Sequence, residues 1–399
     1  MKIQNLFIML LGILASSCSR LPLRAIARED RFALEIGRFE DEIDLFDLES
    51  NTKKVSIAMR DGLFYLSNGS GQKIMRFTSY GDLLFMIYNE ETNPHPLTLR
   101  TNVEDTQSVT RWAFSYPLLD PGEIAVDSQN HIYVEDRLPV ERHGYDQENR
   151  ARLDSLVLHF DENGRFLEYL GQEGVGGTPF PWITGLYTSL GTELAVICRH
   201  FNGWNIYWYD ENGTVLYFIQ LLNRMVPIPQ DRPEAIPSVN AIMAAPDGRK
   251  LLIKVDYYRD IYDESTNTRS GSEQDSSVIW IMNVETGEYI NTIEVPFYEF
   301  TITEGNRRIT ERLFYAMLGV ASNDRVFCYF PVDNGYSLLI LSSHSQDQRR
   351  AFINVDPQEL QYNAFSLSEE GILVGFLATA WQGRIVWWRT DRLAGEIGQ

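Results

Sequence analysis

The sequence has few of the residues on which metal binding and nucleophilic catalysis usually depend. Of its 399 residues, only three are cysteine and six are histidine. No two histidines stand two or four positions apart, so the spacing of a metal-binding pair is missing. The chain also has no G-x-S-x-G, G-x-x-x-x-G-K, H-E-x-x-H or G-x-G-x-x-G segment. The sequence therefore assigns no catalytic residue, no metal site and no cofactor, and it leans away from an enzyme without deciding the question.

Positive charge is also scarce. The chain has 35 Lys and Arg against 55 Asp and Glu, which gives a formal net charge of −20. A polyanion is repelled by such a surface, so general nucleic-acid binding is excluded. No polybasic cluster is present to hold the protein on anionic lipid by charge. After the first twenty residues, no segment approaches 18 uninterrupted apolar positions, so we expect the rest of the chain to lie outside a bilayer.

The N-terminus has the layout of an export signal. Met1 and Lys2 form a short positive segment, and Leu6 to Leu14 is an apolar run too short to span a bilayer. Small residues follow, and then Cys18. The stretch resembles a relaxed bacterial lipobox, in which the cysteine is lipidated and becomes the new N-terminus. The alternative is an ordinary cleaved signal peptide that happens to precede a cysteine.

This interpretation sets the domain boundaries and the compartment. We expect a signal peptide at residues 1–17, a tether at 18–31 and a single domain at 32–399, lipid-anchored and extracytoplasmic in the cell envelope. Several acyl chains together anchor a protein stably without a transmembrane helix. Cys198 and Cys328 both lie in apolar, strand-like runs without a CxxC partner. Although export permits a disulfide, we expect them to be buried free thiols.

The body of the chain repeats one pattern about six times. Each unit has an apolar strand, a tight turn, a second strand, a variable loop, a third strand, another tight turn and a fourth strand. The clearest copy reads EIAVDSQNHIYVED followed by SLVLHFDENGRFLEYL. Short antiparallel strands in such units predict an all-β fold, a β-propeller of six four-stranded blades. The sixth unit lacks a fourth strand, and we expect an N-terminal strand at Glu42 to Leu48 to complete it and close the ring.

Two turns resemble calcium loops at first sight. They are the D-E-N-G segments that end at Gly164 and Gly213. In an EF-hand register, position one would be His159 or Trp208 and position twelve Leu170 or Ile219, so the required carboxylates are missing. Hairpin turns explain both segments better, because Asp opens such a turn and Asn and Gly tolerate positive φ.

The long insertions gather in two kinds of connection. With the four strands of a blade labelled A to D from the centre outward, the A–B and C–D turns are short, and every long excursion is a B–C or D–A connection. All elaboration is therefore expected on one face of the ring, which we call the loop face, opposite the turn face. Loops on a rigid scaffold often carry binding residues, and aromatic and Arg side chains are common interface anchors. The candidate binding residues are Trp112, Trp182, Arg199, His200, Trp204, Tyr257, Tyr258, Tyr262 and Trp381. The alternative is that these aromatic residues pack against one another and cap the ring.

The signal, the relaxed lipobox and the D-G and D-E-N-G turns together resemble poorly characterised spirochaete lipoproteins with NHL-like six-bladed propellers. The resemblance implies a surface-tethered binding or scaffolding module and brings no catalytic residues. We therefore predict a membrane-anchored propeller that binds a protein partner in the cell envelope through its loop face. The alternative function is an enzyme or a glycan-binding lectin with its site at the central opening.

Overall fold

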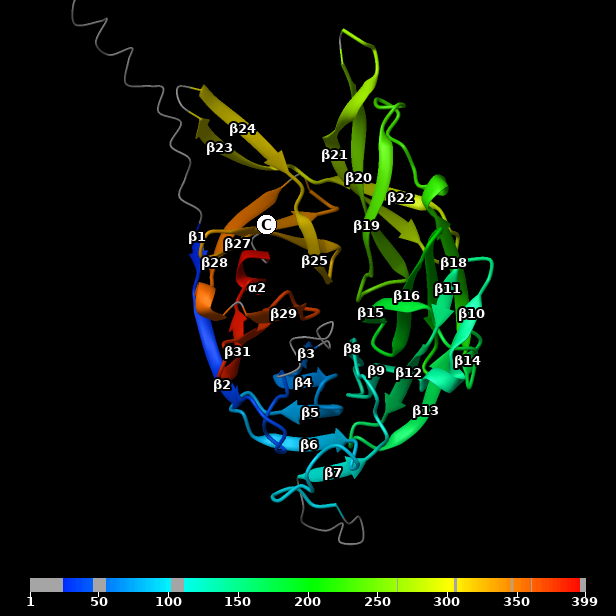
Figure 1. Ribbon diagram of the computed structural model, residues 1–399, viewed down its shortest axis with the longest axis vertical. Helices are drawn as coiled ribbons and strands as arrows, with labels where there is room; N and C mark the ends of the chain where they lie inside the picture. Colours follow the sequence, from blue (N-terminus) through cyan, green and yellow to red (C-terminus); the bar gives the residue numbers. More distant parts are fainter. Residues whose placement is uncertain are drawn as a thin grey trace, which may run out of the picture.

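Six mainly antiparallel sheets are arranged as a ring around a central axis, and Figure 1 looks roughly along that axis. The structure is a computed structural model that describes residues 24–45, 55–101, 111–263, 265–304, 307–345, 347–359 and 361–394. The predicted all-β fold, a six-bladed β-propeller of four-stranded sheets, is confirmed. No helix in these ranges is long and apolar enough to cross a membrane.

The first three blades follow the chain in order, each with strand A at the centre. Their strands are, for blade 1, β3 (Val55–Arg60), β4 (Leu63–Asn68), β5 (Lys73–Phe77), β6 (Leu83–Tyr88) and β7 (Trp112–Ser115); for blade 2, β8 (Ile124–Val126), β9 (Ile132–Arg137), β12 (Ser155–Phe160), β13 (Phe166–Gly171) and β14 (Gly174–Val175); and for blade 3, β15 (Trp182–Ser189), β16 (Glu193–His200), β17 (Gly203–Tyr209) and β18 (Val215–Leu222). A small hairpin of β10 (Gly144–Asp146) and β11 (Ala151–Leu153) fills the B–C connection of blade 2.

The other three blades complete the ring. Their strands are, for blade 4, β19 (Ile236–Ala244), β20 (Lys250–Tyr262), β21 (Arg269–Asn283) and β22 (Tyr289–Glu294); for blade 5, β25 (Ala316–Ala321), β26 (Arg325–Val332), β27 (Gly335–Ser342), β28 (Gln348–Asn354) and β1 (Arg24–Ile26); and for blade 6, β29 (Tyr362–Leu367), β30 (Leu373–Ala378), β31 (Gln382–Trp388) and β2 (Arg28–Glu35). A separate two-stranded ribbon joins blades 4 and 5, and its strands are β23 (Tyr298–Glu304) and β24 (Arg307–Leu313). Helical structure in the described ranges is limited to α2 (Asp391–Ala394) and to 3-10 turns at η1 (Val140–Arg142), η2 (Asn223–Met225) and η3 (Pro357–Glu359).

The hydrophobic core is divided among the six junctions between neighbouring blades. Each of six apolar clusters draws its residues mainly from two adjacent sheets. Burial follows the position of a strand in its blade: β17, an inner strand, is buried along its whole length, whereas β18 at the rim alternates. This alternation is expected because one side of an outer strand faces solvent.

An N-terminal strand closes the ring, but a different segment from the one predicted. Strand β2 pairs antiparallel with β31 from Arg28 to Glu35, and Leu34 joins the core between blades 6 and 1. The prediction of Glu42 to Leu48 is wrong for its described part, because Ile43 only bridges to Ile36 after the chain has turned back. Phe46 to Leu48 lie outside the described residues.

The segment expected to be a tether is also shorter than the sequence suggested. Strand β1 lies parallel to β28 at the rim of blade 5, and β2 begins two residues after β1 ends. The predicted boundary at Arg31 therefore falls inside β2, because residues from Arg24 onward are already held by backbone hydrogen bonds to two different blades.

The D-E-N-G segments are hairpin turns, as predicted. In the first, one carboxylate oxygen of Asp161 accepts hydrogen bonds from the backbone N–H groups of Asn163 and Arg165, at 2.9 and 2.8 Å. Asp210 makes the same two contacts in the second turn. Gly164 and Gly213 have φ values of +85° and +71°, which glycine adopts without steric cost.

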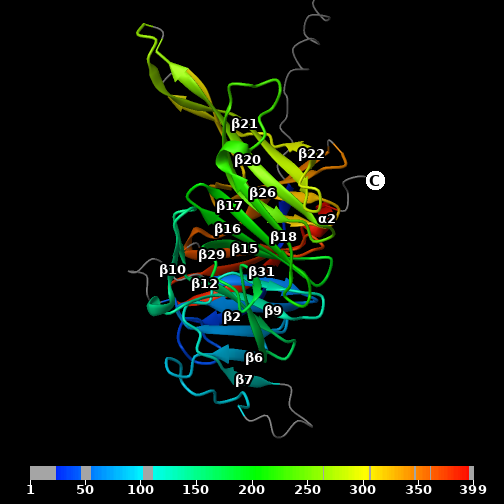
Figure 2. The same ribbon diagram turned by 90° about the vertical axis from the view of Figure 1, so that its right-hand side faces the viewer.

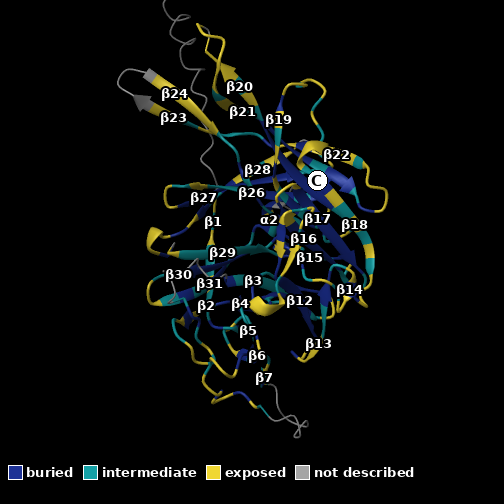
Figure 3. Cartoon of the chain, turned by 45° about the vertical axis from the view of Figure 1, so that its right-hand side comes forward, coloured by how far each residue is buried: buried dark blue, intermediate teal, exposed yellow. Residues whose placement is uncertain are grey.

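The strand order confirms that the long connections between strands lie on one face of the ring. The A–B and C–D turns contain two to five residues each, while the hairpin β10–β11, the ribbon β23–β24 and the extension of β20 and β21 are B–C or D–A connections. Figure 3 shows the outer parts of β20–β21 and β23–β24 as exposed strands that project beyond the buried blades. The loop face is thus built on a rigid ring and differs from the flat turn face.

Candidate functional site

The loop face of blade 3 carries an Arg side chain between two Trp rings. Trp182 at the start of β15 pairs with Arg199 on β16, and Arg199 pairs with Trp204 on β17, so all three side chains lie on one side of the sheet. The guanidinium carbon of Arg199 is 6.0 Å from the ring centre of Trp182 and 5.4 Å from that of Trp204. Trp204 is buried, whereas Arg199 and Trp182 are exposed, Trp182 by 56%. The buried ring therefore supports an exposed Arg–Trp pair whose geometry is fixed before any partner arrives.

His200 is structural rather than part of an exposed site. Its side chain is buried, and Nδ1 accepts a hydrogen bond from the backbone N–H of Asn202 at 3.3 Å. Burial lowers the pKa of His200, so the neutral form that accepts this bond is favoured. The exposed residue of this turn is instead Phe201, which is 69% exposed and lies 5.5 Å from the guanidinium of Arg150. Sequence reasoning missed Phe201, although an aromatic residue before an Asn-Gly turn was a visible signal.

Trp381 is the most exposed tryptophan at a predicted position. It lies in the B–C turn of blade 6 and is 83% exposed. Its backbone N–H donates to the Thr379 hydroxyl at 3.2 Å, which holds the turn while the indole remains in solvent. Blades 3 and 6 are opposite each other in a six-membered ring, so exposed aromatic residues stand on both sides of the central opening.

The three tyrosines of β20 have three different environments. Tyr257 is fully buried, donates its hydroxyl to the Pro227 carbonyl and accepts a hydrogen bond from the Trp280 indole. Tyr258 is half-buried edge-on against Phe314, at 5.6 Å between ring centres. Tyr262 is 55% exposed near the tip of the extension. The prediction of Tyr257 as a binding residue is therefore wrong, because the lower part of β20 belongs to the blade core.

Trp112 does not lie on the loop face either. It begins β7, which adds a fifth strand to the rim of blade 1 parallel to β6, and it pairs with Phe85. Its ring packs against the core between blades 1 and 2. Trp112 therefore contributes to packing at the outer edge of blade 1.

The central opening is narrow. Residues from all six A strands, or from the turns that follow them, line a cavity of about 200 Å³. At the turn-face end, Arg60 makes two hydrogen bonds to the Glu369 carboxylate, at 3.0 and 3.3 Å, and one to the Val126 carbonyl. Small-molecule sites usually have volumes of roughly 300–1,000 Å³. The opening is therefore smaller than most small-molecule sites.

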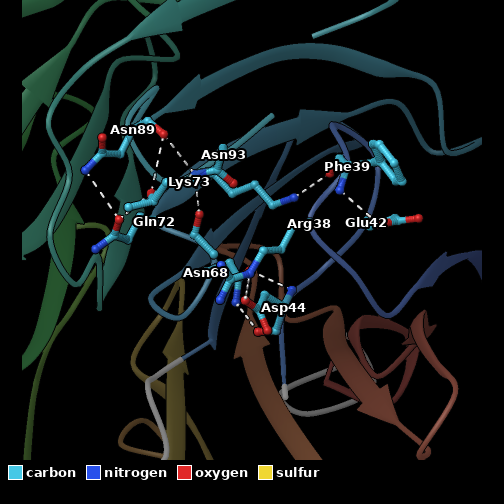
Figure 4. Close-up of polar contacts among 11 residues, drawn as sticks. Arg38, Phe39, Glu42, Asp44, Asn68, Gln72, Lys73, Asn89 and Asn93 are labelled. Carbon is cyan, nitrogen blue, oxygen red and sulfur yellow. Dashed lines mark hydrogen bonds and ion pairs between the residues drawn. The ribbon is translucent and has the colours of Figure 1, made fainter. Parts of the chain in front are cut away.

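A buried polar cluster fastens the N-terminal segment to blade 1, and sequence reasoning did not find it (Figure 4). The Lys73 ammonium, wholly buried, donates to the Phe39 carbonyl at 2.6 Å. Burial lowers the pKa of Lys73 to about 8, although the nearby carboxylates of Glu42 and Asp44 act in the opposite direction. The Asn68 amide exchanges two hydrogen bonds of 2.9 Å with the backbone of Asp44. The sequence alone gives no signal for this cluster. Residues 38–44 follow the strand that closes blade 6, residues 68–73 belong to blade 1, and the two segments meet because the ring closes.

The turn face carries a pair of neighbouring histidines, His131 and His159, whose ring centres are 5.2 Å apart. His159 lies flat against Tyr133 at 4.4 Å, and its Nε2 is 3.3 Å from Nδ1 of His131. Burial, together with His131, lowers the pKa of His159 to about 4. Within the described ranges, no group of three or more His, Cys, Asp or Glu side chains is arranged to hold a metal ion.

One prediction about the cysteines is confirmed, and another concerns a residue outside the described ranges. Cys198 and Cys328 are buried free thiols, as predicted, and burial raises the pKa of both, that of Cys328 to about 12. Cys18, the predicted lipidation site, lies outside the described residues.

Comparison with known proteins assigns no family and no activity to this chain. The sequence matches no protein family and no curated protein. Among solved structures, a gluconolactonase from Xanthomonas campestris is similar over 91% of this chain and 100% of its own, with 10% identity and a TM-score of 0.41. The β-propeller domain of the trilobed protease from Pyrococcus furiosus is similar over 84% of this chain and 96% of its own, with 10% identity and a TM-score of 0.38. Both TM-scores are below 0.5, and these similarities bring no activity to this chain.

Proposed function

We propose that this chain is a lipid-anchored, extracytoplasmic lipoprotein whose propeller binds a protein partner of the cell envelope through its loop face. The observation that carries the proposal is the set of exposed aromatic side chains on that face. Trp182, Phe201 and Trp381 are 56%, 69% and 83% exposed, and they stand on two opposite blades. Large aromatic residues that remain in solvent on a rigid support are common anchors of protein interfaces.

Local electrostatics also support a protein partner. Arg199 and Arg150 stand beside Trp182 and Phe201, so this part of an acidic chain presents cations next to rings. Arg and aromatic residues are enriched in protein interfaces, where such a pair can meet an acidic and apolar patch on a partner. Support for the anchor comes from the apolar run Leu6 to Leu14 and from Cys18, six residues before the first strand.

Mass spectrometry of the mature protein, together with cell fractionation, tests the lipid anchor. The full chain, expressed in a Gram-negative bacterium, is expected to carry acyl groups on Cys18 and to stay in the membrane fraction. Cys18→Ala is expected to be released from it. An unacylated Cys18 in the mature wild-type protein would refute the anchor.

The binding face is tested in intact cells of the source organism. A photo-crosslinking amino acid placed at 182 or 381 is expected to give one discrete adduct of the same partner. The matched control is position 80 on the turn face, because Tyr80 is 83% exposed as well. Trp182→Ala is expected to remove the adduct formed from position 381. Equal adducts from all three positions, or none from 182 and 381 in an acylated and folded protein, would count against the loop face.

A further inference from the structure

The ribbon β23–β24 is amphipathic. One side, called here the apolar side, carries Tyr298, Phe300, Ile302, Ile309 and Leu313 together with Glu311, and the pair Glu304–Arg307 takes its outermost register position; the other side is polar throughout. The sequence of the ribbon alternates, with Y-E-F-T-I-T-E in β23 and R-R-I-T-E-R-L in β24. The register places Ile302 directly opposite Ile309, and Phe300 two residues nearer the body lies on the same side. Thr301 and Thr310 face each other on the other side, where Arg312 also forms an ion pair with Glu299 at 3.0 Å.

Only the base of the apolar side is covered by the protein. Tyr298 stacks on Phe330 at 4.4 Å between ring centres and packs against the core between blades 4 and 5. Beyond it, Ile302 and Ile309 are 40% and 39% exposed. A two-stranded ribbon by itself is marginally stable in water. An apolar environment over the outer half of the ribbon would therefore stabilise it.

The chain enters the fold at the same end of the molecule. In Figures 1 and 3, β1 lies in the half of the molecule from which the ribbon and the extension of β20–β21 project. Arg24, the first residue of β1, is six residues after Cys18, and six residues span at most about 20 Å. The seven residues of β23 extend about as far, at roughly 3.3 Å per residue. A bilayer that holds Cys18 is thus within reach of the outer part of the ribbon.

The charge of the ribbon also fits a lipid surface better than the rest of the chain does. Across residues 298–313 the sequence contains three Glu and three Arg, although the whole chain has a net charge of −20. Arg side chains near an interface can extend their charged ends to the headgroups. Glu311, opposite Phe300, limits the depth of insertion because its carboxylate has to remain hydrated.

We propose that the outer part of β23–β24 lies in the membrane–water interface, with Ile302 and Ile309 directed towards the acyl chains. The ribbon acts as a second, shallow contact beside the lipid on Cys18, and this inference rests on the proposed lipidation. A single flexible attachment leaves a domain free to rotate, whereas a second contact restricts the orientation of the propeller. The aromatic residues of the loop face would then be held at a fixed angle to the membrane.

The test uses the full acylated chain in phosphatidylcholine vesicles. Ile302→Cys is labelled with the environment-sensitive dye NBD, and Thr301→Cys, its neighbour on the polar side, is the matched control. Tyr80→Cys on the turn face reports the signal of a fully hydrated position. Cys198 and Cys328 are buried in the folded protein and are not expected to be labelled. Dye at 302, but not at 301 or 80, is expected to show a blue-shifted emission and quenching by doxyl-labelled lipid.

Two further measurements separate the possible outcomes. Intact mass of the same sample reports acylation, and amide hydrogen exchange of the unlabelled chain reports residues 298–313 without a dye. Slower exchange of this segment on vesicles than in the soluble Cys18→Ala chain supports the inference. An acylated chain whose dye at 302 behaves like that at 80 overturns the ribbon contact alone, as does equal quenching at 301 and 302. A chain without acyl groups overturns the anchor and the ribbon contact together.

Discussion

Replacing Lys73 by Met should abolish a rise in stability that the wild-type protein shows in alkaline solution. The ammonium group of Lys73 is wholly buried, and its pKa is lowered from 10.5 to about 8. Between these two pH values the unfolded chain still binds the proton that the folded protein has released. The free energy of unfolding therefore increases with pH across this window. At 1.36 kcal/mol per pH unit, the shift corresponds to about 3 kcal/mol.

The assay is urea unfolding followed by tryptophan fluorescence at pH 7.5, 8.5, 9.5 and 10.5, under reducing conditions. For the wild type, the contribution of Lys73 is obtained by subtracting the values for Lys73→Met, because other groups titrate in both proteins. Loss of the hydrogen bond to the Phe39 carbonyl is expected to subtract about 1 kcal/mol from the free energy of unfolding of the variant, and this contribution is the same at every pH. That offset does not change the slope.

Gln72→Met is the matched control, since Gln72 lies in the turn directly before Lys73 and does not titrate. Its stability is expected to follow the wild-type slope after a constant offset. If wild type and Lys73→Met have parallel stability curves between pH 8 and 10.5, the buried ammonium is not desolvated as described, and the reasoning fails.

Three further predictions concern other parts of the ring. The pKa of His159 is about 4 in the folded protein, below the ordinary value of 6.5, so the free energy of unfolding should fall by up to about 3 kcal/mol as pH decreases from 6.5 to 4. The variant His159→Gln should therefore unfold at a lower pH than the wild type in an acid titration. An unchanged midpoint would contradict this. Leu34→Ala should lower the free energy of urea unfolding by about 3 kcal/mol because Leu34 is buried between blades 6 and 1, whereas Ala33→Ser, at an exposed neighbour, should cost less than about 0.5 kcal/mol. Cys198 and Cys328 should react with Ellman's reagent only after unfolding, and rapid reaction of either thiol in the native protein would show that it is accessible.

The blade pattern could be predicted because its signals are local. Each hairpin combines alternating strands with a turn whose residues accept positive φ, as at Gly164 and Gly213, and neighbouring strands of a blade are close in sequence. The division of long and short connections between two faces follows from the same strand order. These features need no knowledge of contacts between distant segments.

The closing strand could not be chosen by the same reasoning. The stretch from Glu42 onward alternates apolar and polar residues, whereas Arg28–Glu35 begins with four charged residues, so the local pattern favoured the wrong segment. The choice depends on contacts with blades 6 and 1, such as the packing of Phe32 against Phe64 and Phe77, at 5.7 and 5.2 Å between ring centres. These partners are separated in sequence from one another and from β31, so no local signal identifies them.

The candidate binding residues differ in how far their side chains are buried, and the sequence alone does not show this difference. Tyr257 and Tyr262 lie five residues apart on the same strand, yet the first is wholly buried and the second is 55% exposed. The difference arises because β20 extends beyond the blade after Tyr257, and the length of such an extension is set by pairing with β21. Trp182 and Trp381 remained exposed because they lie where a strand begins and in a turn, where fewer neighbouring strands can cover them.

The position of the closing strand also connects the fold to the proposed anchor. Because β1 pairs with blade 5 and β2 with blade 6, the residues that follow Cys18 after a short interval are part of two sheets. A soluble form that began at Arg31 would lose β1 and the first three residues of β2, including the ion pair between Arg28 and Glu359. Blade 6 would then expose part of the backbone of β31, and the ring would be closed by a shorter ladder. A soluble form that keeps both β1 and β2 whole therefore has to begin at or before Arg24, and in the proposed anchored form only residues 19–23 stand between Cys18 and β1. Such a short connection favours a fixed distance from the membrane, which is the condition under which a rigid face of exposed aromatic residues can meet a partner in the same membrane.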